Sequence, residues 1–373
     1  MFAQQAMPSA PNTRHTPAAG RAFGSRLLVV MLASSFLTSA AISFAQPPLI
    51  NPTLPPNAVQ PGAQGVPAPN RGPAPARPPV AGVQPPAAAP AGAAAQRTGR
   101  EKPEMKMQSL ELMTKDNVTL RAFYFPSDRG KEAIPVIILH EWQGQASPYI
   151  GLVKALWEAG CAVIVPEFRG HGGSREYFVG DRKVEFDLAR MGRADVASII
   201  NGDMEAVKKF LRGENNAGKL NLNALALVGV REGGIVAAHW AVKDLNFPSV
   251  GALKQGQDVK AIVLVSPEKI LKGFSLDETL QDNLLWQLPF LIVAGQTSPQ
   301  FADADRISKR LGIRKKKASG GTAVGLQVET VNTSLSGPAL LNDAPGVTEK
   351  VVTFIKTQLI DRSAKIPWVE RQQ

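Results

Sequence analysis

Histidine and cysteine are scarce in this sequence of 373 residues. Its four histidines are His15, His140, His171 and His239, so the last 134 residues contain none. A catalytic triad whose histidine comes last in the chain therefore has no candidate for that member. The single cysteine, Cys161, excludes a disulfide within one chain, and its apolar neighbours predict a small buried side chain.

Acidic residues are absent from the first 100 positions, although seven arginines lie there. Residues 101–373 hold 35 basic and 31 acidic residues, so this part has a net charge of +4 out of the chain's +11. It is close to charge balance, and no nucleic-acid partner is expected. One dense basic run lies between Arg306 and Lys317. It predicts a solvated helix end, with binding of an anionic polymer as the alternative.

Residues 1–45 have the pattern of a secretory signal peptide. A polar stretch with three arginines precedes the apolar segment Leu27–Ala45, which ends in the small-x-small sequence Ser43-Phe44-Ala45. The alternative is an uncleaved N-terminal anchor, because the 19 apolar residues come close to the ~20 that span a bilayer. Both interpretations place the rest of the chain outside the cytoplasm, periplasmic or secreted. Any membrane attachment would run through this segment alone.

Residues 46–104 are rich in proline, alanine and glycine and lack the apolar side chains that a core requires. Of the chain's 30 prolines, 15 lie between Gln46 and Pro90. This composition predicts a disordered linker with polyproline II character. The linker is either a tether that holds the domain away from a membrane or threads a cell-wall layer, with an envelope partner, or a low-complexity leader with no partner.

Residues 105–360 alternate apolar runs with helical patterns, which predicts an α/β fold: a mostly parallel sheet with helices on both faces. Residues 361–373 form a C-terminal tail. The segments on either side of Lys115-Asp116-Asn117 predict a hairpin. Further strands are expected at 134–139, 162–165, 225–230, 261–265, 290–294 and 328–331. Helices are expected at 148–159, 203–212, 301–311 and 346–358, and one more from the turn after residue 230 to residue 242.

Three motifs follow three of these strands. They are Leu139-His140-Glu141-Trp142, the loop 166–174 (PEFRGHGGS), and the turn 229–234 (GVREGG). In order and spacing they resemble the oxyanion loop, the loop after strand four and the Gly-x-Ser-x-Gly turn of α/β-hydrolases. The resemblance covers about residues 108–358 and is nearest to the dienelactone-hydrolase and serine-aminopeptidase-like branches. It implies an α/β-hydrolase fold.

The same resemblance implies a degenerate catalytic triad. Arg231 stands where the family has its serine nucleophile, Ser298 where it has the acid, and Ser336 where it has the histidine. An arginine side chain stays protonated and cannot attack a carbonyl group. The sequence therefore predicts that hydrolytic chemistry has been lost. The alternative is an ester or amide hydrolase with an unrecognised catalytic arrangement.

Arg231 has two interpretations. In the first it pairs with a carboxylate from the strand ends, because an unpaired buried cation is costly. In the second it binds a small anionic ligand beside the first turn of a helix, whose free N–H groups favour anions. The candidate partners in the first case are Glu141, Glu167, Glu268 and Asp343, and the candidate binding residues in the second are Arg231, Glu232, Glu141, Trp142, Gly229 and Gly233.

Four side chains in the first two loops could in principle ligate a metal: His140, Glu141, Glu167 and His171. They lack the close, regular spacing of a metal-ligand pair. In the family that these loops resemble, the histidines usually bond to the backbone. No metal and no cofactor are therefore predicted. The function that we expect is an exported, non-catalytic binding or scaffold module. A structural envelope protein, in which the linker matters more than any pocket, is the other alternative.

Overall fold

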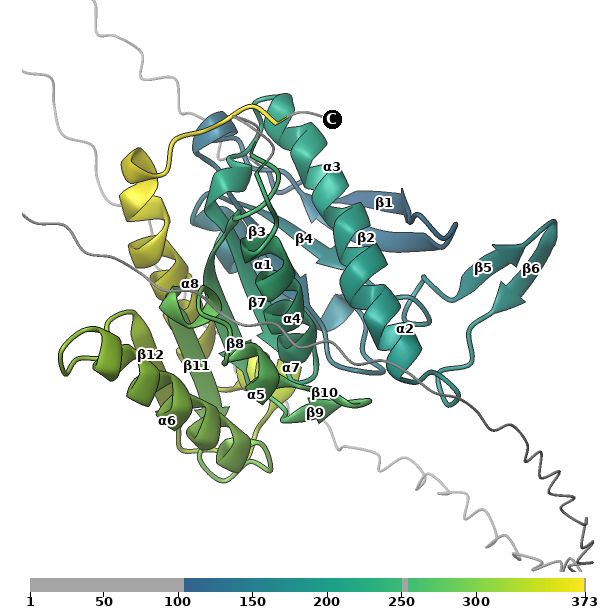
Figure 1. The fold of residues 1–373 in the computed structure, drawn as a ribbon. Helices are drawn as coiled ribbons and strands as arrows, with labels where there is room; N and C mark the ends of the chain where they lie inside the picture. Colours follow the sequence, from purple (N-terminus) through teal and green to yellow (C-terminus); the bar gives the residue numbers. More distant parts are fainter. Residues whose placement is uncertain (1–103, 250–253, 372–373) are drawn as a thin grey trace, which may run out of the picture. The chain divides into compact units, whose positions relative to one another are not determined.

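Figure 1 shows the computed structural model of the chain, which describes residues 104–249 and 254–371. The predicted signal peptide or anchor and all but the last residue of the predicted linker lie outside the described residues. Within the two described ranges, no helix has both the length and the apolar character needed to span a membrane.

An eight-stranded sheet lies at the centre of the described residues (Figure 1), in the order β1-β2-β4-β3-β7-β8-β11-β12. Strand β2 is antiparallel to both of its neighbours, and the remaining neighbours are parallel. Four strands (β3, β4, β7 and β11) are buried at every position, which explains their continuous apolar runs. The strands are β1 (Gln108–Met113), β2 (Thr119–Phe125), β3 (Ile134–Leu139), β4 (Cys161–Pro166), β7 (Leu225–Val230), β8 (Val259–Val265), β11 (Phe290–Gly295) and β12 (Leu326–Val331).

Helices cover both faces of this sheet, as the sequence predicts. Alternate strand residues point to opposite faces, so Ile137 and Leu139 join one core cluster while Val136 and Ile138 join the other. The first cluster includes residues of five helices: α2 (Arg193–Ser198), α3 (Met204–Asn216), α4 (Gly233–Leu245), α5 (Leu276–Thr279) and α6 (Phe301–Ala318). The second cluster includes residues of three helices on the other face: α1 (Ile150–Glu158), α7 (Gly337–Asp343) and α8 (Val347–Gln358). The predicted fold class is therefore confirmed.

Two features differ from the sequence-based expectation. The helix predicted from residue 203 is part of a longer unit, because α2 begins at Arg193 and joins α3 through a π-helical turn at Ile199–Asp203. Two small antiparallel hairpins were not predicted: β5 (Glu176–Val179) with β6 (Arg182–Glu185), and β9 (Ile270–Leu271) with β10 (Phe274–Ser275).

A buried arginine joins the loop after β4 to two other elements. Arg169 donates from Nε to Asp203 Oδ1 at 3.0 Å and from Nη1 to Asp116 Oδ2 at 2.6 Å. The hydrogen bond from Arg169 lowers the pKa of Asp116 to about 2. The turn of the predicted hairpin therefore also supplies an ionic contact that fixes this loop.

The basic run of α6 is less solvated than the sequence predicts. Lys315 is buried and donates to the carbonyl oxygens of Leu288 at 2.8 Å and Val324 at 3.2 Å. Burial lowers its pKa to about 8. Other members of the run have acidic partners: Arg306 and Arg310 pair with Asp277, and Lys309 pairs with Asp305.

The predicted tail is held against the folded domain. Its backbone carbonyl groups accept hydrogen bonds from three buried asparagines: Asn221 to Ile366 at 2.7 Å, Asn223 to Pro367 at 3.0 Å and Asn215 to Val369 at 3.0 Å. Arg371 is 3% exposed and forms an ion pair with the buried Asp258. Residues 366–371 thus form a strap across the domain, which we call the C-terminal strap.

The ion pair of the C-terminal strap should contribute measurably to stability. Arg371→Ala leaves the buried carboxylate of Asp258 with lysine partners only, and we expect it to lower the free energy of unfolding by about 3 kcal/mol. Urea unfolding followed by far-ultraviolet circular dichroism measures this loss. The control is Arg190→Ala, which removes an exposed pair with Asp187 and should cost under about 0.5 kcal/mol. Equal effects of the two substitutions would contradict the assigned role of Arg371.

Candidate functional site

A sharp turn joins β7 to α4 at the position of the predicted motif. Arg231, the residue at its apex, has a φ of +49°, in the left-handed region that residues other than glycine rarely adopt. A Cβ atom at Gly229 would collide with Gly234, and one at Gly233 would collide with the carbonyl oxygen of Leu139. Gly229 is therefore required where β7 approaches α4, and Gly233 where α4 approaches the end of β3. The geometry of a nucleophile elbow is present with arginine at its apex.

The guanidinium group of Arg231 is paired within the protein. Its Nε and Nη2 atoms lie 3.2 and 2.9 Å from Oε1 of Glu268, and the same oxygen accepts from Gln300 at 2.9 Å. Glu232 lies 3.8 Å from Nη2. Partial burial lowers the pKa of Arg231, but the neighbouring carboxylates have the larger effect, so the pKa of Arg231 is raised. Of the four carboxylates considered from the sequence, Glu268 is the one that the structure brings into hydrogen-bond contact with Arg231.

The loop 139–142, which resembles an oxyanion loop, also contacts the elbow. The backbone N–H of Trp142 donates to Oε2 of Glu232 at 3.2 Å. In a hydrolase of this fold, an N–H group from this loop helps to bind the oxyanion of the reaction intermediate. Here a carboxylate of the same chain accepts from that loop. Burial raises the pKa of Glu232, against the opposing effects of Arg231 and the Trp142 N–H.

Ser298 and Ser336, which the sequence resemblance assigns to the acid and histidine positions, follow the neighbouring strands β11 and β12 at the same edge of the sheet. Ser298 is buried, and its hydroxyl group donates to the carbonyl oxygen of Gly295 at 2.8 Å. Ser336 precedes α7, and a Cβ atom at the next residue, Gly337, would lie 3.0 Å from Cδ of Arg231. The structure thus brings the Ser336–Gly337 step against Arg231. It also places Ser298 two residues before Gln300, which shares Glu268 with Arg231.

The histidines of the first two loops hold backbone groups. His140 contacts the carbonyl oxygen of Glu141 through Nδ1 at 2.7 Å and accepts from the Phe168 N–H through Nε2 at 3.1 Å. These contacts assign its proton to Nδ1. His171 contacts the carbonyl oxygen of Arg169 through Nδ1 at 2.9 Å. Burial lowers the pKa of each histidine to about 4.

The carboxylates of the two loops are also engaged. Glu141 accepts from the hydroxyl group of the buried Tyr149, and Glu167 accepts from the backbone N–H groups of Ala146 at 3.1 Å and Gly173 at 2.6 Å. Among residues 104–249 and 254–371, no group of three or more histidine, cysteine, aspartate or glutamate side chains is placed to hold a metal ion.

Two residues near the elbow escaped the sequence analysis. Gln300 reaches Glu268 from the residue before α6, and Lys272 lies over the ring of Trp142 with its Nζ 5.8 Å from the ring centroid. Neither belongs to a motif, so no local pattern could have revealed them. Ser266, the residue after β8, has a φ of +47° and accepts from the Gly337 N–H at 3.0 Å. It therefore fixes the loop that carries Ser336.

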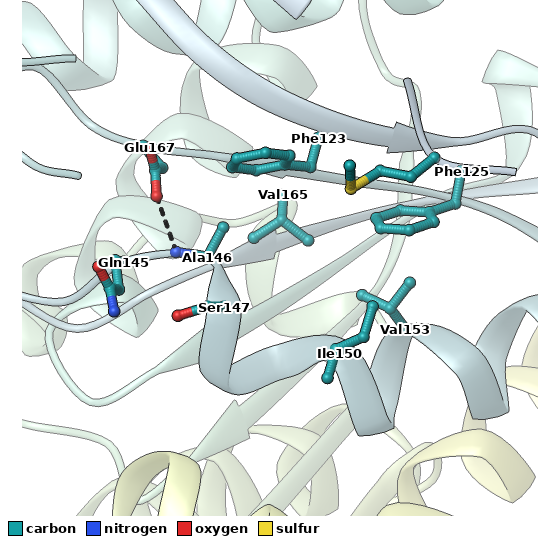
Figure 2. Close-up of a pocket in the computed structure, with 10 residues that line it drawn as sticks. Phe123, Phe125, Gln145, Ala146, Ser147, Ile150, Val153, Val165 and Glu167 are labelled. Atoms are coloured by element: carbon teal, nitrogen blue, oxygen red, sulfur yellow. Dashed lines mark hydrogen bonds between the residues drawn. The ribbon is translucent and has the colours of Figure 1, made fainter. Parts of the chain in front are cut away.

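A separate pocket of about 460 Å³ lies between β2, β4 and α1. Figure 2 shows Phe123, Phe125 and Val165 on one side and Ile150 and Val153 of α1 on the other. Its buried lining residues belong to the core cluster that packs against α1 and α8, whereas α4 packs against the other cluster. None of residues 229–234 lines this pocket, so it is separate from the elbow, and the sequence did not predict it.

The strand order, the antiparallel second strand and the elbow after β7 define an α/β-hydrolase fold. No protein-family model matches the sequence, and no curated protein matches it. Solved structures similar to this chain include three esterases. The esterase of Pyrococcus furiosus is 16% identical in sequence, with a TM-score of 0.48 over 68% of this chain and 91% of the esterase chain. A thermostable carboxyl esterase of Bacillus coagulans is 14% identical, with a TM-score of 0.49 over 68% of this chain and 99% of its own. The esterase of Pyrobaculum calidifontis is 14% identical, with a TM-score of 0.47 over 68% of this chain and 86% of its own.

Acid should destabilise the fold through the loop histidines. Their pKa values are near 4 in the folded protein and about 6.5 in the unfolded chain, so between pH 6.5 and 4 only the unfolded chain takes up these protons. The contribution of each neutral histidine to the free energy of unfolding is fully present above pH 6.5. It decreases as the pH drops toward 4, by roughly 3 kcal/mol for each histidine.

Denaturant unfolding at a series of pH values tests this effect with His171→Asn, whose amide can still donate to Arg169. The difference in unfolding free energy between wild type and variant should shrink as the pH falls from 6.5 to 4. A difference that is constant over this range would show that His171 is not a buried neutral side chain.

Proposed function

We propose that this protein uses an α/β-hydrolase fold without catalysing hydrolysis and acts as a binding or scaffold module. The observation that carries this proposal is the ion pair at the elbow, where Arg231 lies at the apex of the turn and contacts Glu268 at 2.9 Å. In the family that the sequence resembles, the nucleophile stands at this apex. A permanently protonated guanidinium group has no lone pair with which to attack a carbonyl carbon. Loss of a triad nucleophile costs roughly 10⁶-fold in rate in a serine hydrolase.

The position of Glu232 supports the same proposal. Its carboxylate accepts from the Trp142 N–H, in the loop that would supply a donor to an oxyanion. A negative charge there repels the negative charge that develops on a substrate carbonyl during acyl transfer. The remaining rate enhancement that an oxyanion hole can give without a triad is therefore also reduced.

Hydrolysis by an unrecognised arrangement is the alternative function. It would need a base near the elbow, and Glu232 is the suitable group there because burial raises its pKa. His140 and His171 fit this role less well, because both are buried and contact backbone carbonyl groups through Nδ1. The two functions therefore differ in what substitution of Glu232 should do.

We expect the purified protein to hydrolyse short-chain p-nitrophenyl esters no faster than the buffer blank. The assay compares wild type with Glu232→Gln and with Arg231→Ser, which restores the serine but not the acid or the histidine. All three should match the blank. Turnover by wild type that disappears in Glu232→Gln would overturn the proposal and establish the alternative.

A small anionic ligand at Arg231 is less well supported. Glu268 already accepts from two nitrogen atoms of Arg231, Glu232 lies 3.8 Å away, and Glu141 also raises the pKa of Arg231. Three carboxylates around one guanidinium group give the edge a net negative charge, which opposes a further anion. The pairing of Arg231 is therefore better explained as a substitute for the lost triad contacts.

The proposed site of action is outside the cytoplasm, on the basis of the signal-like pattern of residues 1–45. Amino-terminal sequencing of the protein recovered from its host should then begin at Gln46 if the segment is cleaved. A protein that retains residue 1 and sediments with membranes would instead support the anchor. Recovery of the full-length chain from the cytoplasm would contradict export.

A structural envelope protein, in which the linker carries the function, is the other alternative. In that case, deletion of residues 46–98 should change where the protein is found in the cell.

A further inference from the structure

The pocket between β2, β4 and α1 has the properties of a small-molecule site. Its volume of about 460 Å³ falls in the usual range for ligand pockets, which is about 300–1,000 Å³. Phe125, Val153 and Val165 form a floor that is at most 3% exposed. Met107 and Ile150, at its rim, are 58% and 51% exposed. A buried apolar floor with an exposed apolar rim favours an apolar ligand body.

The two ends of the pocket differ in polarity. Figure 2 shows Gln145, Ser147 and Glu167 at one end and Phe125 and Val153 at the other. The polar end is formed by residues that follow the loop 139–142 and strand β4, and the apolar end lies along β2 and α1. A ligand that fills the pocket would therefore be amphiphilic, with its polar group beside Glu167.

Glu167 determines the charge of that polar group. It is 5% exposed and is held by the N–H groups of Ala146 and Gly173. No lysine, arginine or histidine nitrogen of the described ranges lies within 4.0 Å of its carboxylate. Arg121 packs against Gly173, but it is exposed and does not line the pocket. A buried carboxylate that lacks a cationic partner favours a cation over an anion.

We propose that this pocket binds a free amphiphile with an apolar chain and a primary ammonium group, with the ammonium beside Glu167 and the chain over Phe123 and Phe125. The site is independent of the proposed loss of hydrolysis. The pocket lies on the other face of the sheet from α4, and its argument uses no residue of the elbow.

Calorimetric titration of the full chain with decylamine, decanol and decanoate, each below its critical micelle concentration, tests the proposal. Decylamine should bind about tenfold more tightly than decanol, since a charge-assisted hydrogen bond exceeds a neutral one by about that factor. Decanoate should bind more weakly than decanol. Equal affinity for the three probes, tighter binding of decanoate, or no binding of decylamine would overturn the proposal.

Two variants locate the binding. Glu167→Gln should remove the preference for decylamine over decanol. If that variant does not fold, Ile150→Lys provides a second test, because it places a positive charge at an exposed rim position without altering the core. It should weaken decylamine binding about tenfold. The matched control is Ile313→Lys on α6, 68% exposed and away from the pocket, which should bind decylamine as wild type does. An equal loss in both lysine variants would contradict the assigned site.

A parallel sedimentation assay uses vesicles of phosphatidylethanolamine, whose head group also carries a primary ammonium. The proposal expects no sedimentation of the protein with these vesicles. Binding to vesicles without binding of monomeric decylamine would show a lipid surface as the ligand and would overturn the assignment to a free amphiphile.

Discussion

The close approach of β7 and α4 is the constraint on which the functional edge depends. No side chain fits at Gly229, which lies against Gly234 of α4, or at Gly233, which lies against the backbone of Leu139 and His140. The chain turns sharply between these two glycines. That turn forces residue 231 into a left-handed conformation and projects its side chain above the sheet, whatever the residue is. The elbow therefore carries an arginine at its apex in a strained backbone conformation. Arg231 is held there by its own N–H bond to Val265 at 2.9 Å and by Glu268.

The sequence predicted the parts of the fold whose signals are local. Strands β3, β4 and β7 are apolar throughout because both of their faces are buried, and this pattern needs no tertiary information. The start of α2 was missed because the π-helical turn at Ile199–Asp203 shifts the helical phase and breaks the apolar periodicity. Lys315 was misjudged because one of its two carbonyl partners, Leu288, lies 27 residues away in the sequence and approaches α6 only in the folded chain.

The sequence predicted where the residues of the candidate site lie better than it predicted which side chains they contact. The motif spacing located Arg231, Ser298 and Ser336, and the structure brings these segments to one edge of the sheet. Glu268 was one of four carboxylates considered, and only the packing of neighbouring strand ends selects it. The contact of Glu232 with the Trp142 N–H depends on the path of a loop, which no residue pattern specifies. The pocket lined by Phe123 and Phe125 likewise arises from what α1 leaves uncovered on β2.

The C-terminal strap determines where the chain can be truncated without loss of buried contacts. The last long helix ends at Gln358, and a boundary drawn there on secondary structure alone would discard the strap. The shortened protein would present the amides of Asn215, Asn221 and Asn223 without their carbonyl partners and Asp258 without its arginine. Buried polar groups that lose their partners favour local opening and association with other chains. A deletion series or a fusion junction should therefore keep the chain intact through Arg371.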